Sequence, residues 1–335
     1  MLQIPYDEAV DTMAKGLSRF MEAETARHFA SIFADNSADG IASHGLNRFA
    51  RYMDDMATGI CNPKVLQAEY VSGFGGFETW DAHFGVGPII AEQMGKRAMT
   101  LAGEHGIGCV ALRNNSHWLR AGRYALQMAK EGYVSFCFTN TCMNMAAWGS
   151  KQLSTGNNPM AMAVPYEGEG LLMDMAVSQY AFGKLEVMAQ QGKLMDTPCG
   201  YDAQGNETND PKKIIDGGMM FPMAMWKGSA LSIMLDLMAV TLSAGRSSLE
   251  IGEPKDGEKG MSQVYIAIHP DALPDQEAVQ EKIRTTLHFF HSLNEQQSRG
   301  GVHAPGENLS AVRKKNMEQG IPVTEATWHK IMSIC

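Results

Sequence analysis

The chain has 335 residues, of which 44% are hydrophobic and 19% charged, so it can bury a sizeable core. Its net charge of −9 argues against nucleic acid as a partner, because no basic run offsets the repulsion of a polyanion. No apolar stretch reaches the roughly 18 residues that span a bilayer, residues 1–20 lack a signal-peptide pattern, and the six cysteines show no C-x-x-C spacing. We therefore expect a cytoplasmic protein with free thiols and no membrane contact.

Helical periodicity dominates the first 60 residues. Ala9, Met13 and Leu17 recur at spacings of four, and residues 47–56 form a second amphipathic pattern that ends near Gly59. Two short β-rich pieces follow, at 65–71 and 77–80.

Helix and strand patterns then alternate along the middle of the chain. Helices are expected at 88–104, 120–131 and 178–191. Strands are expected at 107–112, 134–139, 160–164 and 171–174. A polar connection over 192–219 is expected to be a long loop, followed by an apolar helix at 226–244, a buried strand at 263–269 and a helical tail.

This order predicts an α/β protein with two domains. An α/β domain would cover 76–274, and a mainly helical domain would combine 1–75 with 275–335.

Common cofactor and catalytic motifs are missing from the sequence. The nearest approach to G-x-G-x-x-G begins at Gly106, but it leads from a helix into a strand, the reverse of the Rossmann order. No P-loop or G-x-S-x-G elbow is present. His288 and His291 have no acidic or cysteine partner at a recognisable spacing, so no metal site is predicted.

Four polar clusters remain as candidates for chemistry. Ser43, His44 and Arg48 surround the start of a helix, although Ser43 can also be read as a cap and Arg48 as a solvated residue. His117 follows a core strand, at a place where α/β proteins often carry function. Lys227 opens the apolar helix, where amides and an ammonium suit a phosphate, and the fourth cluster is the turn at 304–307.

Together these residues resemble the malate and L-lactate dehydrogenase family that is unrelated to the Rossmann enzymes. The matching stretches run in order over nearly the whole chain: SHGLNRF at 43–49, HGIGCVALRNNSHWLRAGRYA at 105–125, GNNP at 156–159, MDMAVS at 173–178, WKGSALSIMLD at 226–236 and PGE at 305–307. Within the family, Trp118, FGKLEV at 182–187 and the segment 221–236 are most similar to the members that reduce 2,3-diketo-L-gulonate.

The resemblance implies a homodimer with a non-Rossmann nucleotide-binding domain, a largely antiparallel sheet, and NADH or NADPH as the cofactor. His44 matches the proton donor, Arg48 a basic residue near the substrate, and His117 a second histidine that some members use for acid–base work. Some relatives carry a supporting aspartate where this chain has Lys184, so that role is vacant or filled by Ser43. Cofactor contacts would fall on Asn140, Asp174, Met175, Ala176, Trp226, Lys227, Gly306 and Glu307.

The expected reaction is the reduction of a 2-oxo acid to a 2-hydroxy acid, with 2,3-diketo-L-gulonate giving 3-keto-L-gulonate. Malate, L-lactate, ureidoglycolate and a cyclic imino acid stay open as alternative substrates within the family. A non-catalytic metabolite-binding protein is the alternative from another class, and the sequence leaves the choice between NADH and NADPH open.

Overall fold

A computed structural model describes residues 1–293 and 301–335 of the chain. It is an α/β structure with mixed sheets, and twelve α-helices lie in the described part. Among these residues, no helix combines the length and the apolar character that crossing a membrane requires.

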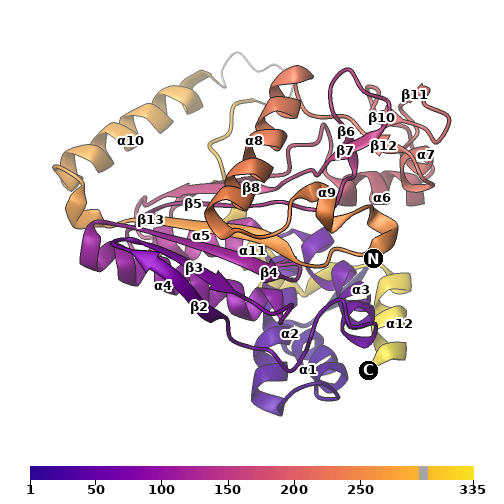
Figure 1. Cartoon of the computed structure of the whole chain (residues 1–335), viewed down its shortest axis with the longest axis horizontal. Coiled ribbons are helices and arrows are strands. Elements are labelled where there is room, and N and C mark those ends of the chain that lie inside the picture. The colour runs from indigo at the N-terminus through magenta and orange to yellow at the C-terminus, as the bar shows by residue number, and fades with distance from the viewer. Residues whose placement is uncertain (294–300) are drawn as a thin grey trace.

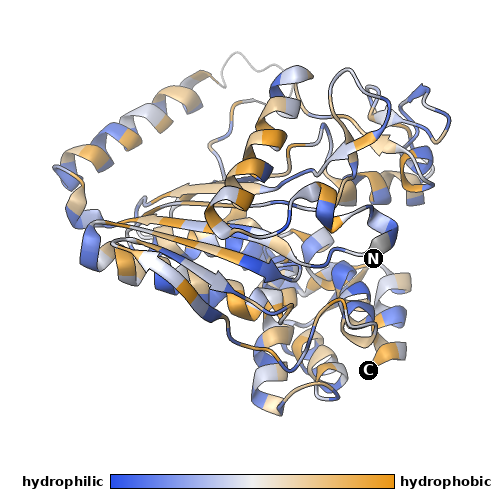
Figure 2. Cartoon of the chain, in the orientation of Figure 1, coloured by the Kyte–Doolittle hydropathy of each residue, from blue (hydrophilic) through white to orange (hydrophobic). Residues whose placement is uncertain are grey.

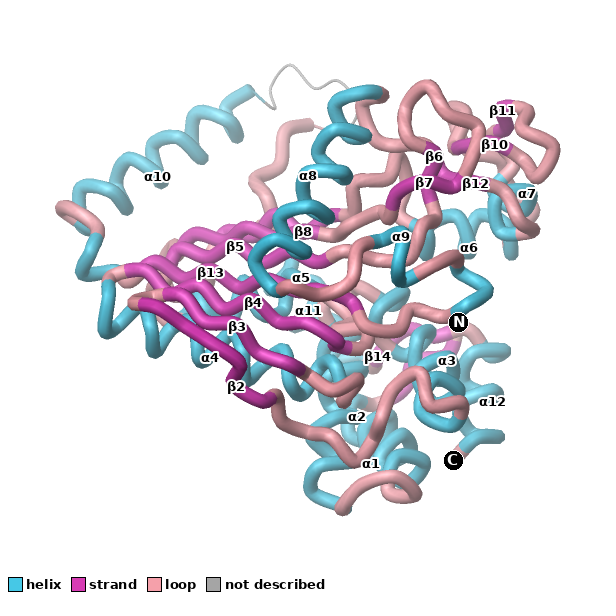
Figure 3. Tube along the Cα trace, in the orientation of Figure 1, coloured by secondary structure: helices cyan, strands magenta, loops and turns pink. Residues whose placement is uncertain are grey.

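A seven-stranded sheet forms the centre of the molecule (Figure 3). Its strands, in spatial order, are β2 (Glu69–Phe74), β3 (Phe77–Asp81), β4 (Ile107–Asn115), β13 (Met261–Ile268), β5 (Val134–Thr139), β8 (Met160–Val164) and β9 (Leu171–Met175). Only β3 and β4 run parallel, and every other neighbouring pair is antiparallel. Strand β9 comes last in this order and, among the described residues, pairs only with β8, so it is an edge strand.

Helices cover both faces of this sheet (Figure 1). Since successive side chains of a strand point to opposite faces, Val110 and Leu112 of β4 pack against α4 (Gly87–His105) and α5 (Ala121–Lys130). Ala111 between them faces α8 (Trp226–Ser243) on the other side. Each face of the sheet thus has its own apolar core.

A separate core belongs to helices from both ends of the sequence. It joins α1 (Tyr6–Leu17), α2 (Ala23–Ala38) and α3 (Leu46–Ala57) to α12 (Glu325–Ile334). Strand β1 (Leu2–Ile4) pairs with β14 (Ile321–Val323), and α11 (Leu309–Gln319) precedes β14. We call these elements the helical lobe, and the seven-stranded sheet with its covering helices the sheet lobe. The helix α10 (Gln276–Ser292) lies away from α1 and α2 (Figure 1), and the domain boundaries of the sequence analysis stay a prediction.

A small five-stranded sheet lies beside the large one. Its strands are β11 (Glu207–Thr208), β10 (Gly200–Tyr201), β12 (Met219–Met220), β6 (Met145–Ala146) and β7 (Leu153–Thr155). Three of these strands and the short α7 (Pro211–Ile215) lie in the stretch predicted as a loop. That prediction was wrong because two-residue strands are too short to show a period of two.

Most of the longer predicted elements are confirmed within a few residues. The helix expected from residue 178 begins later, as α6 (Phe182–Gln190), because Ser178 forms a β-bridge with Pro222 and the Gln179 amide donates to the Phe221 carbonyl. The remaining short helix, α9 (Ser248–Ile251), starts at a capping box formed by Ser247 and Glu250.

The aromatic centre of the helical lobe gives a test of the fold. Phe33 is fully buried and its ring lies 5.4 Å from that of Phe49 and 5.8 Å from that of Tyr52. We expect Phe33→Ala to lower the free energy of unfolding by about 3–5 kcal/mol, because it removes a packed ring and leaves a cavity. Phe74→Ala is the control, since Phe74 is 91% exposed and should change stability by less than about 0.5 kcal/mol. Equal shifts of the two urea midpoints would contradict this packing.

Candidate functional site

Two histidines that are distant in sequence stack face to face. His44 ends a 3₁₀ turn (Ala42–His44) in the helical lobe, and His117 follows β4 in the sheet lobe. Their ring centroids are 5.8 Å apart and their planes differ by 14°. Each histidine is a candidate from its own sequence motif, and the structure brings the two together.

The end of α2 fixes the turn that carries His44. The Asn36 side-chain amide donates to the His44 carbonyl at 2.9 Å, and the Ser37 hydroxyl accepts from the Leu46 amide at 2.8 Å. A Cβ on Gly45 would come within 2.0 Å of the Ser37 hydroxyl oxygen, so the close approach at this position requires glycine.

Hydrogen bonds and burial set the protonation of the pair. The His117 Nδ1 accepts from the Leu119 amide at 3.0 Å, so the proton of the neutral ring lies on Nε2. Burial lowers the pKa of His44 to about 4, with Arg48 acting in the same direction and Asp174 against it. Burial also holds the pKa of His117 well below its usual range, with Arg48 again contributing. Both imidazoles are therefore neutral near pH 7.

Arg48 lies close to both histidines and retains a free donor. Its Nη2 donates to the Glu258 carboxylate at 2.7 Å, while its Nε is buried without a hydrogen-bond partner in the part of the chain that the structure describes. A buried donor left unpaired costs free energy, which a ligand oxygen would recover. Glu258 lies in the charged loop before β13, and nothing in the sequence pattern pointed to it.

Ser43 is the hydrogen-bonding neighbour of His44, with its hydroxyl 3.1 Å from Nδ1. The start of α6 closes over this contact, because a Cβ on Gly183 would lie 2.3 Å from the Ser43 Cβ. Lys184, which replaces the supporting aspartate of some relatives, holds its ammonium 5.3 Å above the Tyr180 ring. Of Ser43 and Lys184, the described structure gives only the serine a hydrogen bond to the His44 ring.

Asp174 lies on the edge strand β9 and acts electrostatically on His44. Its carboxylate accepts from the Arg120 Nε at 2.9 Å, and Arg120 also donates to Asp39 of α2 at 2.7 Å. A Cβ on Gly122 would come within 2.4 Å of the same carboxylate. Asp174 is thus held by α5 and carries its charge next to His44.

The three stretches singled out for cofactor contacts flank the end of β9. Strand residue Leu172 donates its amide to the Pro305 carbonyl at 3.2 Å, and Gly306 packs against the same residue, two positions before Asp174 in β9. The Met223 amide donates to the Val177 carbonyl at 2.8 Å, just before Trp226 and Lys227 begin α8.

The start of α8 differs from the phosphate cradle that the sequence suggested. The amides of Lys227, Gly228 and Ser229 donate to the carbonyls of residues 223–225, so they are already paired. Among the described residues, the Lys227 ammonium has no hydrogen-bond or ion-pair partner, and Trp226 beside it is 62% exposed. An ammonium and an exposed indole remain, and together they suit an anionic, aromatic ligand.

Two other predicted cofactor residues are engaged within the protein. The Asn140 amide group donates to Asp236 and to the Arg246 carbonyl, each at 2.7 Å, and its oxygen accepts from the Ser262 amide. Glu307 accepts from His291 at 2.7 Å and from His303 at 2.5 Å, and these contacts lower its pKa to about 2. Their backbone amides are paired as well, since the Asn140 amide donates to the Ser262 carbonyl and the Glu307 amide to the Ala304 carbonyl.

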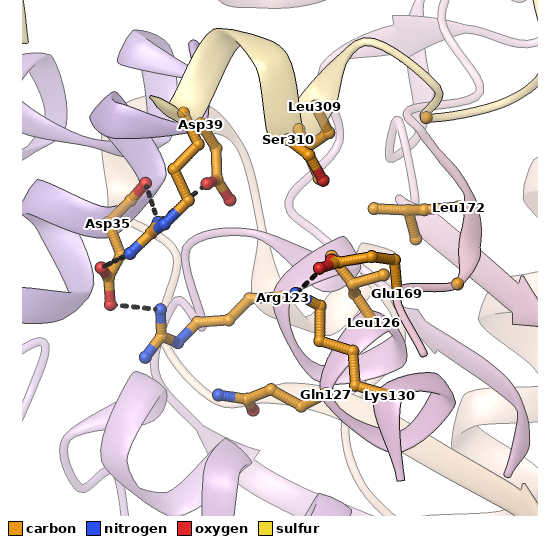
Figure 4. A pocket seen from close by; sticks show the side chains of 13 residues that line it. Asp35, Asp39, Arg123, Leu126, Gln127, Lys130, Glu169, Leu172, Leu309 and Ser310 are labelled. Carbon is orange, nitrogen blue, oxygen red and sulfur yellow. Dashed lines mark hydrogen bonds and ion pairs between the residues drawn. The ribbon is translucent and has the colours of Figure 1, made fainter. Parts of the chain in front are cut away.

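A cavity of about 270 Å³ lies apart from the histidine pair, between α2, α5 and α11 (Figure 4). Its charged side chains are paired with one another: Asp35 accepts from Arg123 and Arg313, and Lys130 meets Glu169 at 2.7 Å. Gly306 and Leu172 also line it. With its charges mutually satisfied, this cavity offers little to an ionic ligand, and its ion pairs join the two lobes.

Comparison with known proteins gives relatives that are all named as dehydrogenases or reductases. The family model for malate/L-lactate dehydrogenase matches residues 4–332. The 2,3-diketo-L-gulonate reductase of Pasteurella multocida is 38% identical over 318 residues, covering 95% of each chain. Among solved structures, the Δ1-piperideine-2-carboxylate reductase of Pseudomonas syringae is 25% identical with a TM-score of 0.87, and each chain is covered completely. The malate dehydrogenase of Entamoeba histolytica has the same fold, with a TM-score of 0.91 at 22% identity over 99% of this chain and 97% of that one.

The match extends over nearly all of the sequence and includes the segments that carry the stacked histidines and Arg48. The chain therefore belongs to the malate/L-lactate dehydrogenase family and is an oxidoreductase.

Proposed function

We propose that the chain reduces a 2-oxo acid to a 2-hydroxy acid with a reduced nicotinamide cofactor, and that its substrate is 2,3-diketo-L-gulonate, which gives 3-keto-L-gulonate. The observation that carries the proposal is the stacked pair His44 and His117 beside Arg48, whose buried Nε lacks a partner among the described residues. The 38% identity to a 2,3-diketo-L-gulonate reductase supports the substrate.

His44 is the proton donor of this mechanism. A reduced nicotinamide, when bound, would supply the hydride, and negative charge would then develop on the former carbonyl oxygen. An imidazole can protonate that oxygen, and the Ser43 hydroxyl on Nδ1 orients the ring so that Nε2 faces the substrate. The substrate brings its own negative charge, which raises the pKa of His44 from its low value toward neutral pH.

Arg48 binds the carboxylate of the 2-oxo acid, and His117 donates a hydrogen bond to the oxygen of its carbonyl group. The guanidinium donates from Nη2 to Glu258 and has an unpaired Nε, so it can donate from Nε to a carboxylate oxygen without breaking the existing bond. The His117 Nε2–H, fixed by the bond at Nδ1, is a donor for the oxygen that gains charge.

The cofactor would lie along the end of β9. Lys227 would pair with a phosphate, and Trp226 would stack on an aromatic ring of the cofactor. The other residues of this proposed site are Asn140, Asp174, Met175, Ala176, Gly306 and Glu307. We propose NADH as the cofactor, with NADPH as the alternative, and a cofactor-binding domain over residues 76–274.

A homodimer in the cytoplasm completes the proposal. Helix α8 exposes Ile233, Met234, Leu237 and Met238, and Figure 2 shows hydrophobic segments along its visible length. Such a face is typical of a subunit interface, and the mass of the protein in solution tests it. All six cysteines of the chain are free thiols, as is usual in a reducing compartment.

Replacing the histidines one at a time tests their roles. His44→Ala should lower kcat for reduction by about 10²–10⁴-fold, because general acid catalysis typically contributes that much. His117→Ala should cause a smaller loss, since His117 only stabilises charge in this mechanism. Stopped-flow absorbance of the reduced cofactor gives both rates. A larger loss in the His117 variant would transfer the role of proton donor to that residue.

The pH profile gives a second test of His44. Only the protonated ring can donate, and above a pKa of about 4 the protonated fraction falls tenfold for each pH unit. We therefore expect kcat/KM for reduction to rise as the pH falls from about 8 to about 5, and this slope to vanish in His44→Ala. Oxidation uses the neutral ring, so its kcat/KM should stay flat over the same range. A reduction profile that is flat in the native protein would contradict the assignment.

Lys227→Ala tests the cofactor site. Loss of one charge-assisted contact of about 1.5–3 kcal/mol should weaken NADH binding by at least about tenfold. Lys193→Ala is the matched control, because Lys193 is an exposed lysine in the connection after α6. Fluorescence titration with NADH measures both dissociation constants. Equal affinities in the two variants would remove Lys227 from the site.

A further inference from the structure

Glu258 places a largely buried carboxylate beside Arg48, the residue proposed to bind the carboxylate of the substrate. Its side chain is 11% exposed, and one oxygen lies 2.7 Å from the Arg48 Nη2 and 3.8 Å from the Arg51 Nη2. Burial opposes ionisation here, but the two guanidiniums outweigh it and hold the pKa of Glu258 below its usual value. The group is therefore a carboxylate at neutral pH.

The neighbours of Glu258 fix it in this position. The Lys259 ammonium donates to the Gly59 carbonyl at 3.0 Å and lies 5.0 Å above the Phe84 ring. On the other side, a Cβ on Gly257 would come within 2.5 Å of the Ile60 side chain. The loop is thus held against the helical lobe on both sides of Glu258, unlike an ion pair between two exposed, flexible side chains.

The positive charges of Arg48 and Arg51 already have carboxyl groups of the protein close to them. Arg48 and Arg51 act electrostatically on Glu258 and also on Asp55, another carboxyl group of the helical lobe. They act on Glu186 of α6 as well, so the two guanidiniums face three carboxyl groups of the chain itself. What remains for a substrate is the unpaired Arg48 Nε, which suits one carboxylate.

A second anionic group on the substrate would meet Glu258. An ionised carboxylate only accepts hydrogen bonds, so it repels another carboxylate but binds a hydroxyl or an amide N–H. Like charges brought together in a region shielded from water cost several kcal/mol. We infer that Glu258 is a specificity-determining residue that excludes dicarboxylates and favours 2-oxo acids with a neutral, hydrogen-bond-donating tail. This inference rests on the proposed reduction of 2-oxo acids.

Oxaloacetate and its 4-amide, 2-oxosuccinamate, are the probes, because they have the same size and differ in charge at one end. In the native protein, kcat/KM should favour the amide by at least about tenfold, which corresponds to about 1.4 kcal/mol. Glu258→Gln keeps the size of the side chain and removes its charge. In that variant the ratio should fall to near one, chiefly through a gain with oxaloacetate.

Two further variants serve as controls. Glu258→Asp keeps the charge and should keep the preference for the amide, even if total activity falls. Glu169→Gln removes a carboxylate whose ion pair with Lys130 is also 2.7 Å long but is exposed at both ends, and it should leave the ratio unchanged. Urea unfolding of each variant shows that it is folded.

The outcomes separate this inference from the proposed function. Native protein that reduces 2-oxosuccinamate and oxaloacetate equally well, or a Glu258→Gln variant that keeps the native ratio, would overturn the role of Glu258 and leave the reductase standing. No turnover with any 2-oxo acid would overturn both. If Glu258→Gln does not fold, the native ratio and the Glu258→Asp ratio decide, and loss of the preference in the aspartate variant overturns the inference.

Discussion

Two carboxylates at the end of α2 hold the helical lobe against the sheet lobe. Asp35 accepts from Arg123 of α5 and Arg313 of α11, while Asp39 accepts from Arg313 and from Arg120. Apart from the partly exposed Arg313, these side chains are largely shielded from water, and a buried carboxylate that lost its partner would cost several kcal/mol. The lobes therefore have a defined relative position. This position also fixes His44 of the helical lobe relative to His117 of the sheet lobe.

The position of His44, the proposed proton donor, follows from the same stretch of α2. Asn36 and Ser37, which lie between the two carboxylates in sequence, hold the turn that presents His44. Arg120 carries the connection on from Asp39 to Asp174, whose negative charge raises the pKa of His44 against the effect of burial. One set of ion pairs thus joins the lobes, positions the imidazole and contributes to its proton affinity.

Part of the fold and of the candidate site could be predicted from the sequence, because it depends on local patterns. The turn before α3 and the strand before His117 both follow from short-range signals, and the proposed roles of His44 and Arg48 come from the resemblance to the dehydrogenase family. Helical and strand periods also placed most of the elements of the large sheet. The two-residue strands of the small sheet have no such period, so they were missed.

The contacts that decide the chemistry are long-range. Arg48 and Glu258 are 210 residues apart, and a glutamate in a charged loop looks like any solvated residue until the fold brings it to the anchor. In the same way, the sequence could not show that the Asn140 side chain is hydrogen-bonded within the protein, or that the first backbone amides of α8 already have hydrogen-bond partners. These are properties of packing, which no pattern along one segment encodes.

The most direct test of the central claim follows the absorbance of the reduced nicotinamide. Purified protein would be mixed with NADH or NADPH and, in parallel, with 2,3-diketo-L-gulonate, pyruvate, oxaloacetate or piperideine-2-carboxylate. We predict rapid loss of absorbance with 2,3-diketo-L-gulonate and NADH. Loss with a different acid would keep the mechanism and change the substrate, whereas binding of the cofactor without turnover on any acid would contradict the claim and favour a metabolite-binding protein.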